Sequence, residues 1–168
     1  MSESVSEELQ RKVAERVWGK CSDWLNGIVM QVAPDGGGSD NDETAIPGEV
    51  LYGRAVRPFM SICEIAPEQF VEGQGWNDRD LVVHTVTCVI YAAKDTVERH
   101  PALWRKVRET AIRSIHKYRF TLSQEGSCVW YANARPQSFL NGAAWARQTR
   151  FVSAFDLLFR TQEPRLHT

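Results

Sequence analysis

The longest mainly apolar run of the sequence, Leu81–Ala93, constrains the fold more than any other segment. Its β-branched and apolar residues occupy both alternating sets of positions, which indicates a strand that is covered at least partly on both faces. The run is much longer than a typical strand of ~5–6 residues, and it is too short and too β-branched for a membrane-spanning helix. The sequence therefore predicts a central strand that extends past its neighbours into a hairpin.

Two segments have the periodicity of amphipathic helices. The first is Ser6–Met30, and Ser4 with Glu7 has the spacing of a capping box at its start. The second begins at Pro101, a residue that suits the first position of a helix, and ends near Tyr118. The apolar stripes consist of Leu9, Val13, Val17, Cys21, Trp24 or Leu25, and Ile28 in the first helix, and of Leu103, Trp104, Val107, Ala111, Ile112, Ile115 and Tyr118 in the second. Each helix should therefore bury one side against the sheet.

Three further segments have the character of strands: Phe59–Ile65 ahead of the central strand, then Ser127–Tyr131 and Arg147–Thr161 after the second helix. The connections between strands are loops rather than crossover helices, which favours antiparallel pairing. The order of elements is helix, strand, strand, helix, strand, strand. The sequence thus predicts the α+β class, with a mainly antiparallel four-stranded sheet and two helices packed on one face.

All 168 residues are expected to form a single domain. The segment Pro34–Gly48, with three consecutive glycines, four acids and two prolines, is expected to be a flexible insertion. Asp40, Asp42 and Glu43 within it are oxygen ligands that calcium prefers, but their spacing does not match a calcium-binding loop. We therefore expect a solvated loop there, and a loose polar tail at residues 162–168.

Composition and charge argue against several classes of protein. The chain has 20 basic and 21 acidic residues, so it lacks the positive excess with which nucleic-acid-binding proteins displace counterions, and no specific nucleic-acid partner is expected. The polar, acidic start of the chain cannot form the apolar core of a secretory signal, and no membrane partner is expected. The four cysteines lack the spacing of zinc ligands, so we expect reduced and mostly buried thiols in a protein made in the cytoplasm.

The sequence contains no HExxH, GxSxG, GxxxxGK[ST] or GxGxxG motif. The glycines of Gly36–Gly38 are followed by acids, which would repel a phosphate group. His84 and Cys88 are four residues apart on one strand, and the strand rise separates them by about 13 Å, too far for a hydrogen-bonded pair. We therefore expect His84 to be an ordinary strand residue, and we expect no enzyme, no cofactor, and no catalytic, cofactor-binding or metal-binding residue.

The loops carry aromatic and charged residues of the kinds that dominate protein interfaces. The residues that we expect at an interface are Trp76, Asp78, Arg79, Arg135, Phe139, Trp145, Arg150 and Arg160. Under this hypothesis, Trp76→Ala should weaken assembly and leave the circular dichroism of the monomer intact. The alternative is that Trp76 and Trp145 fold back and close the ends of the sheet.

The arrangement resembles the tail terminator and tail-completion (neck) proteins of long-tailed bacteriophages. The resemblance spans nearly the whole chain, from an N-terminal helix and a variable acidic, glycine-rich stretch to the final strand. It is carried by the segments PFMSICE (Pro58–Glu64), VVHTVTCVIYAAKD, HPALWRKVRETAIRSIH and TRFVSAFDLLFRTQE. The family has no short invariant motif, so no individual functional residue carries over.

The resemblance implies a structural virion protein at the phage neck, assembled in the host cytoplasm. In the family, subunits form a ring, commonly of six, which caps the tail tube, stops its growth and joins it to the head. The implied partners are other copies of the chain, the tail tube protein and the head–tail connector or stopper protein. Two alternatives stay open. One is another neck or connector subunit such as a head–tail stopper, and the other is a cytosolic small-ligand-binding domain or enzyme in which His84, Thr85 and Tyr91 line a pocket.

Overall fold

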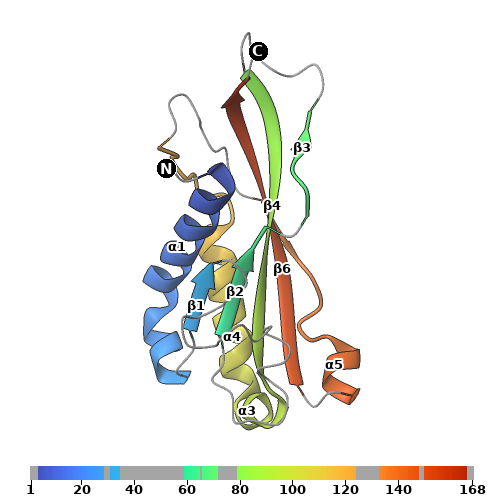
Figure 1. Cartoon of the computed structure of the whole chain (residues 1–168). Helices are drawn as coiled ribbons and strands as arrows, with labels where there is room; N and C mark the ends of the chain where they lie inside the picture. Colours follow the sequence, from blue (N-terminus) through green and yellow to red (C-terminus); the bar gives the residue numbers. More distant parts are fainter. Residues whose placement is uncertain are drawn as a thin grey trace, which may run out of the picture.

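The computed structural model describes residues 4–28, 31–34, 59–64, 66–71, 79–123, 133–147 and 150–165, without the side chains of 23–28, 31–34 and 59. The elements are α1 (Val5–Ile28), β1 (Gln31–Pro34), β2 (Phe59–Cys63), β3 (Gln69–Phe70), β4 (Arg79–Ala93), α3 (Lys94–Arg99), α4 (Pro101–Ile115), β5 (Asn133–Pro136), α5 (Gly142–Arg147) and β6 (Arg150–Pro164). The two long strands β4 and β6 run the length of the molecule (Figure 1).

Within the described residues the sheet has six strands in the order β1-β2-β4-β6-β5, with β3 also paired to β4. β4 and β6 pair antiparallel from Arg79 opposite Pro164 to Ala93 opposite Arg150. β1 and β2 are parallel, and the remaining pairs are antiparallel. The predicted α+β class with a mainly antiparallel sheet is confirmed, although the sheet has more strands than the four expected. The additional strands β1, β3 and β5 are too short to show an alternating pattern in the sequence.

Several predicted boundaries differ from the structure. β6 continues past its predicted end at Thr161, because Gln162–Pro164 pair with the first residues of β4 and so do not belong to a loose tail. The segment between the predicted strands Phe59–Ile65 and Leu81–Ala93 contains β3, and the segment between the predicted strands Ser127–Tyr131 and Arg147–Thr161 contains β5 and most of α5. The predicted strand Ser127–Tyr131 and residues 35–48 of the predicted insertion lie outside the described residues.

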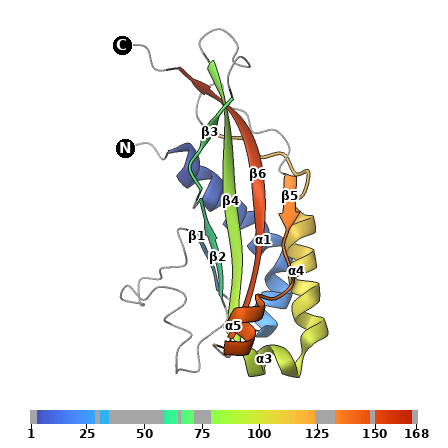
Figure 2. The same cartoon turned by 90° about the vertical axis from the view of Figure 1, so that its right-hand side faces the viewer.

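The two predicted helices are α1 and α4, which pack against each other on one face of the sheet (Figures 1 and 2). The capping box at the start of α1 is confirmed: Ser4 N donates to Glu7 Oε2 at 2.8 Å, and Glu7 N donates to Ser4 Oγ at 3.2 Å. These bonds satisfy backbone N–H groups that the first turn of a helix leaves without partners. α4 begins at Pro101 as predicted and ends at Ile115.

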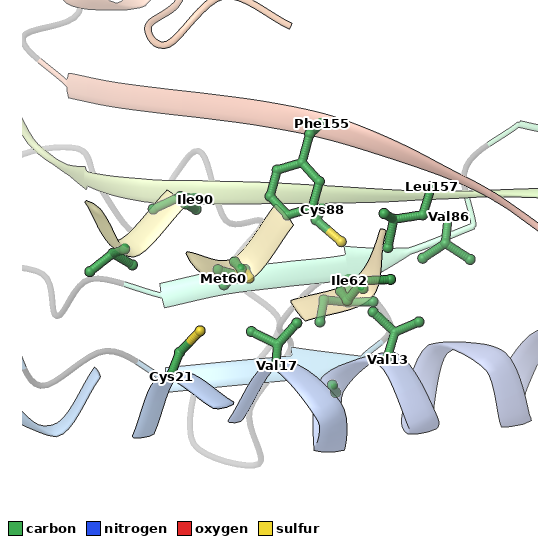
Figure 3. Close-up of a cluster of buried hydrophobic side chains, with 14 of the residues drawn as sticks. Val13, Val17, Cys21, Met60, Ile62, Val86, Cys88, Ile90, Phe155 and Leu157 are labelled. Carbon is green, nitrogen blue, oxygen red and sulfur yellow. The ribbon is translucent and has the colours of Figure 1, made fainter. Parts of the chain in front are cut away.

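The core lies between the two helices and the sheet (Figure 3). Alternate residues of β4, such as Val86 and Cys88, and of β6, such as Phe155 and Leu157, are buried on the side that faces the helices. The helices contribute Leu9, Val13, Val17, Cys21, Trp104, Val107, Ala111 and Ile115 to this core.

The alternate residues of β4 and β6 on the other side of the sheet are mostly half-buried. We call this side the open face, and it consists of Val83, Thr85, Thr87, Val89, Tyr91, Val152, Ala154, Asp156, Leu158 and Arg160. Among the described residues, α1 and α4 do not cover it, and the short helix α5 packs on β6 at one end of the strand (Figures 1 and 2). The sheet therefore has two faces that differ in character.

Candidate functional site

The open face and its margins carry most of the charged residues predicted at an interface. Arg150 and Arg160 belong to the same alternating row of β6 as the open face, and Arg79 begins the corresponding row of β4. Arg135 of β5 lies opposite Asp156, and directly opposite residues of an antiparallel pair project to the same side. The structure thus places these four arginines on one side of the sheet.

The middle of the open face is apolar or uncharged. The part of the β4 row that belongs to the open face, from Val83 to Tyr91, contains valine, threonine and tyrosine but no charged residue. Asp156, the acid of the β6 row, accepts a hydrogen bond from Thr87 Oγ1 at 2.9 Å and another from Gln137 Nε2 at 3.3 Å. Arg135 and Arg160 are exposed, and their side chains make no hydrogen bond or ion pair with another described residue. The two arginines are therefore available to an external acid.

A hollow of about 320 Å³ borders the β6 row of the open face. Its lining consists of Gln137, Ser138, Leu140, Asn141, Gly142, Val152 and Ala154. Asn141 fixes one wall, because its N donates to Val152 O at 2.9 Å and its Oδ1 accepts from Ala144 N at 3.1 Å. Hydrogen bonds within the fold therefore hold this wall of the hollow in place.

Phe139 and Trp145, also predicted at an interface, pack around one core residue. Their rings lie 5.1 Å and 6.4 Å from the ring of Phe151, between centroids. The outer surfaces carry cations, with Arg105 over Phe139 at 4.2 Å and Lys94 over Trp145 at 5.0 Å. Both aromatic residues are half-buried, so they close the end of the core as the alternative supposed, and their part in an interface stays a prediction. Trp76 and Asp78 lie outside the described residues.

Among the residues that the structure describes, three large apolar side chains are exposed that the sequence did not predict at an interface. They are Trp18 at 41%, Phe70 at 65% and Tyr118 at 38% exposure. Tyr118 was predicted in the apolar stripe of the second helix, but α4 ends before it, and its ring lies under the guanidinium of Arg16 at 3.7 Å. Arg16 and Tyr118 line a second hollow, of about 440 Å³, between α1 and residues 118–121.

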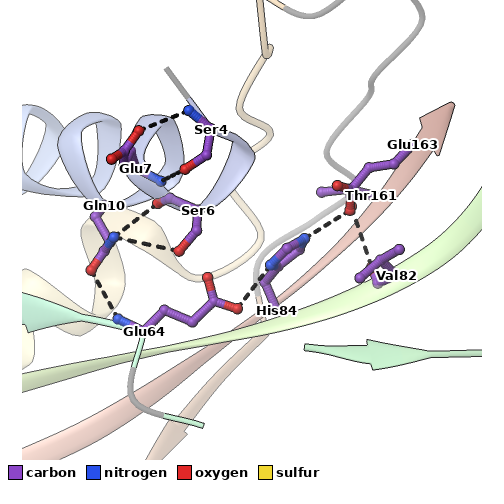
Figure 4. Close-up of polar contacts among 9 residues, drawn as sticks. All are labelled: Ser4, Ser6, Glu7, Gln10, Glu64, Val82, His84, Thr161 and Glu163. Carbon is purple, nitrogen blue, oxygen red and sulfur yellow. Dashed lines mark hydrogen bonds and ion pairs between the residues drawn. The ribbon is translucent and has the colours of Figure 1, made fainter. Parts of the chain in front are cut away.

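A buried polar cluster lies near the start of α1 (Figure 4). The ring of His84 is held between two carboxylates, with Nδ1 2.8 Å from Glu64 Oε1 and Nε2 2.9 Å from Glu163 Oε2. Thr161 Oγ1 donates to the same Glu163 oxygen at 2.6 Å. Gln10 Oε1 accepts from Glu64 N at 3.0 Å, which ties α1 to the end of β2.

The cluster holds His84 as an imidazolium. Burial disfavours its charged form, but hydrogen bonds to Glu163 and Glu64 and the charges of both outweigh burial and raise the pKa of His84 to about 9. Burial acts to raise the pKa of Glu163, yet the bonds from His84 and Thr161 prevail and lower it. Glu64 Oε2 is buried and has no partner among the described atoms.

This arrangement leaves His84 no free nitrogen for acid–base chemistry. Cys88 cannot serve as its nucleophile, because burial first and the charge of Asp156 second raise the pKa of the Cys88 thiol. The imidazolium itself occupies the place between the carboxylates where a cation would sit. In the described part of the chain, no group of three or more His, Cys, Asp or Glu residues is arranged to hold a metal ion.

His84 is thus not the ordinary strand residue that we expected. The two carboxylates lie 20 and 79 residues away in the sequence, so no local motif announces them. The available signal was position: His84 lies in the same alternating row as Val82 and Val86, and a polar group on a buried row needs a partner. Alternation also places Thr85 and Tyr91 on the opposite side of the sheet from His84, so the three cannot line one pocket.

Three of the four cysteines are described. Cys21, Cys63 and Cys88 form no disulfide bond among the described residues, and Cys21 and Cys88 are buried. No helix within the described ranges is long and apolar enough to cross a membrane. Comparison with models of protein families and with curated proteins finds no match to this chain.

Proposed function

We propose that the chain is a structural virion protein, a ring-forming tail terminator at the neck of a long-tailed bacteriophage. It caps the tail tube and joins the tube to the head. Its partners are other copies of itself, in a ring of about six by the family resemblance, together with the tail tube protein and the head–tail connector or stopper protein. The role needs no catalysis and no cofactor, and the protein resides in the virion after assembly in the host cytoplasm.

The fold supports the proposal. The resemblance implied an N-terminal helix, a long central strand, a second helix soon after it and a long final strand, and these are α1, β4, α4 and β6. An architecture alone does not fix a function. The architecture does contain the four elements that the family resemblance implied.

The observation that carries the proposal is the difference between the two sides of the subunit. One side is the layer formed by α1 and α4, and the other is the open face with its row of uncharged residues and its exposed arginines. A ring requires that each subunit offer two different, complementary surfaces, because the contact runs head to tail. A two-layer subunit with unlike sides has that property.

The chemistry of the described residues favours a role by contact. Of the histidines that the structure describes, the buried one, His84, has both ring nitrogens engaged by carboxylates. The exposed aromatic residues and arginines are types enriched at the energetic centres of interfaces. These features suit binding to other polypeptides better than transformation of a small molecule.

Two measurements test the proposal. Light scattering over a concentration series, with electron microscopy of the same samples, should show closed rings of a defined mass. In a phage that carries the gene, its deletion should give headless tails whose tubes vary in length, and the protein should be found at the ends of wild-type tubes. Tubes of normal length in the deletion, or the protein on tail-less heads, would contradict a terminator, and the latter would favour a stopper.

A further inference from the structure

We propose that neighbouring copies of the chain meet through one side of α1 on one copy and the open face on the next. The inference rests on the proposed function, because it names the two surfaces that a head-to-tail ring would join. The α1 surface, which we call the outer stripe, consists of Glu7, Arg11, Glu15 and Trp18. These residues are spaced by three or four positions and so share one side of the helix, away from the buried Leu9, Val13 and Val17.

Trp18 is the residue that most needs an explanation. Its side chain is 41% exposed, although tryptophan is one of the most costly side chains to leave in water. Trp18 belongs to α1 and so to the helical layer, whereas the open face is on the other side of the sheet. A contact between Trp18 and the open face therefore requires a second copy.

The charges of the two surfaces are complementary. The outer stripe has two acids and one base, with Glu15 and Arg11 in an exposed ion pair at 3.0 Å. The open face and its margin have the exposed Arg135 and Arg160, while Asp156 is already satisfied within the fold. Glu7 and Glu15 already bind Ser4 N and Arg11, but both remain exposed. Acids on one copy would thus meet arginines on the next.

The spacing of these charges matches as well. Glu7 and Glu15 are eight residues apart, or about 12 Å at the rise of an α-helix. Arg135 lies beside Asp156, four residues from Arg160 along β6, which is about 13 Å at the rise of a strand. A helix laid along β6 can therefore place Glu15 on Arg135 and Glu7 on Arg160 together.

The same alignment gives Trp18 a binding place. Trp18 is three residues beyond Glu15, or about 4.5 Å along the helix, in the direction that leads from Arg135 toward Ala154 and Val152. Those two residues line the 320 Å³ hollow beside β6. The reversed helix would carry Trp18 past Arg160 and away from the hollow, so the geometry selects one orientation.

The area of this contact predicts how strongly two copies of the chain associate. A helix of 24 residues is about 36 Å long and about 10 Å wide, so it covers roughly 360 Å² of the opposing face. Counting both partners, about 700 Å² falls in the range of weak interfaces. Single contacts should therefore be concentration-dependent, and closure of a ring, in which each subunit makes two contacts, should stabilise the assembly.

A charge exchange tests the proposal on the full chain. Glu15→Arg and Arg135→Glu should each raise the concentration for half-assembly by about tenfold, since each puts like charges opposite each other, and the double variant should return it toward the wild-type value. Glu109→Arg is the matched control, because Glu109 forms an ion pair with Arg113 at 2.9 Å on α4 and its side chain is 59% exposed, against 64% for Glu15. Trp18→Ala should also weaken assembly by about tenfold, whereas Phe70→Ala on β3 should not.

The outcomes separate this contact from the proposed function. A wild-type chain that stays monomeric at all concentrations overturns the contact. The contact is also overturned if the single charge reversals do not weaken assembly, or if the double variant assembles no better than the single variants. Either result remains compatible with a ring that forms through other surfaces. Rescue by the double variant together with tails of normal length in the gene deletion would support the contact and reject the terminator. Circular dichroism checks the fold of each variant, and Glu15→Gln with Arg135→Gln replaces any reversal that unfolds.

Discussion

His84 and Glu64 are joined at 2.8 Å between Nδ1 and Oε1, where the end of β2 meets the middle of β4. Glu163 holds the other ring nitrogen at 2.9 Å, so the imidazolium links strands on both sides of β4. The charged ring is buried, and only the folded chain supplies both carboxylates. The cluster should therefore couple the protonation of His84 to folding.

The first prediction concerns pH. The unfolded imidazole titrates near pH 6.5, while the folded one keeps its proton up to about pH 9. Between these values the folded state binds one more proton, so the free energy of unfolding falls as pH rises. The contribution is complete below pH 6.5 and lost above pH 9, a total of up to about 3 kcal/mol. Urea denaturation of the wild type should show this slope and His84→Gln should lack it; equal slopes would contradict the prediction.

The second prediction compares a buried with an exposed carboxylate. Glu64→Ala should lower the free energy of unfolding by about 3 kcal/mol, because a buried imidazolium loses one of its two counter-charges. Glu109→Ala is the control, since the side chain of Glu109 is 59% exposed and removal of such a surface ion pair costs at most about 1 kcal/mol. Chemical denaturation at pH 7 measures both. Similar losses in the two variants would show that the cluster contributes little.

Much of the fold follows from periodicity in the sequence. Apolar residues recur at helical spacing in α1 and α4, and alternation is long enough in β4 and β6 to identify both strands. The capping box of α1 is a local motif, so Ser4 and Glu7 could be assigned without tertiary information. Elements whose formation depends on residues close together in the sequence were therefore predictable.

The rest depends on neighbours that are distant in the chain. β3 has only two residues and exists because Gln69 and Phe70 pair with β4. The hydrogen bonds of His84 depend on how β2 and β6 flank β4, which no local pattern contains. The exposure of Trp18 likewise depends on which side of α1 the sheet covers. Long-range pairing decides the candidate site, and the sequence alone does not state it.

The third prediction concerns thiol reactivity in a Cys128→Ser background, which leaves three cysteines. Burial raises the pKa of the Cys21 thiol to about 11, and burial with the charge of Asp156 raises that of Cys88. Both thiols are fully buried, whereas Cys63 is partly accessible. Because the thiolate is the reactive form, a thiol reagent at pH 8 should modify Cys63 first in the native protein and all three after denaturation. Intact-mass analysis over time reports the order, and early labelling of Cys88 would contradict it.

The last prediction concerns Phe151, the common partner of three aromatic rings. Trp104, Phe139 and Trp145 have ring centroids 5.7, 5.1 and 6.4 Å from its own. Phe151 is fully buried, so Phe151→Ala should lower the free energy of unfolding by about 3–5 kcal/mol through the lost burial and the cavity left behind. It should also loosen α5, which packs on β6 through Trp145, and so shift the tryptophan fluorescence of the folded protein to longer wavelength.

Phe139→Ala is the control for this effect. Phe139 touches the same ring but is only half-buried, and Arg105 covers its outer surface. Less apolar area is lost there, so the destabilisation should be clearly smaller than that of Phe151→Ala. Urea denaturation followed by circular dichroism and by fluorescence measures both variants. If Phe139→Ala proved as costly as Phe151→Ala, the aromatic cluster would depend on the segment before α5, and Phe151 would not be its centre.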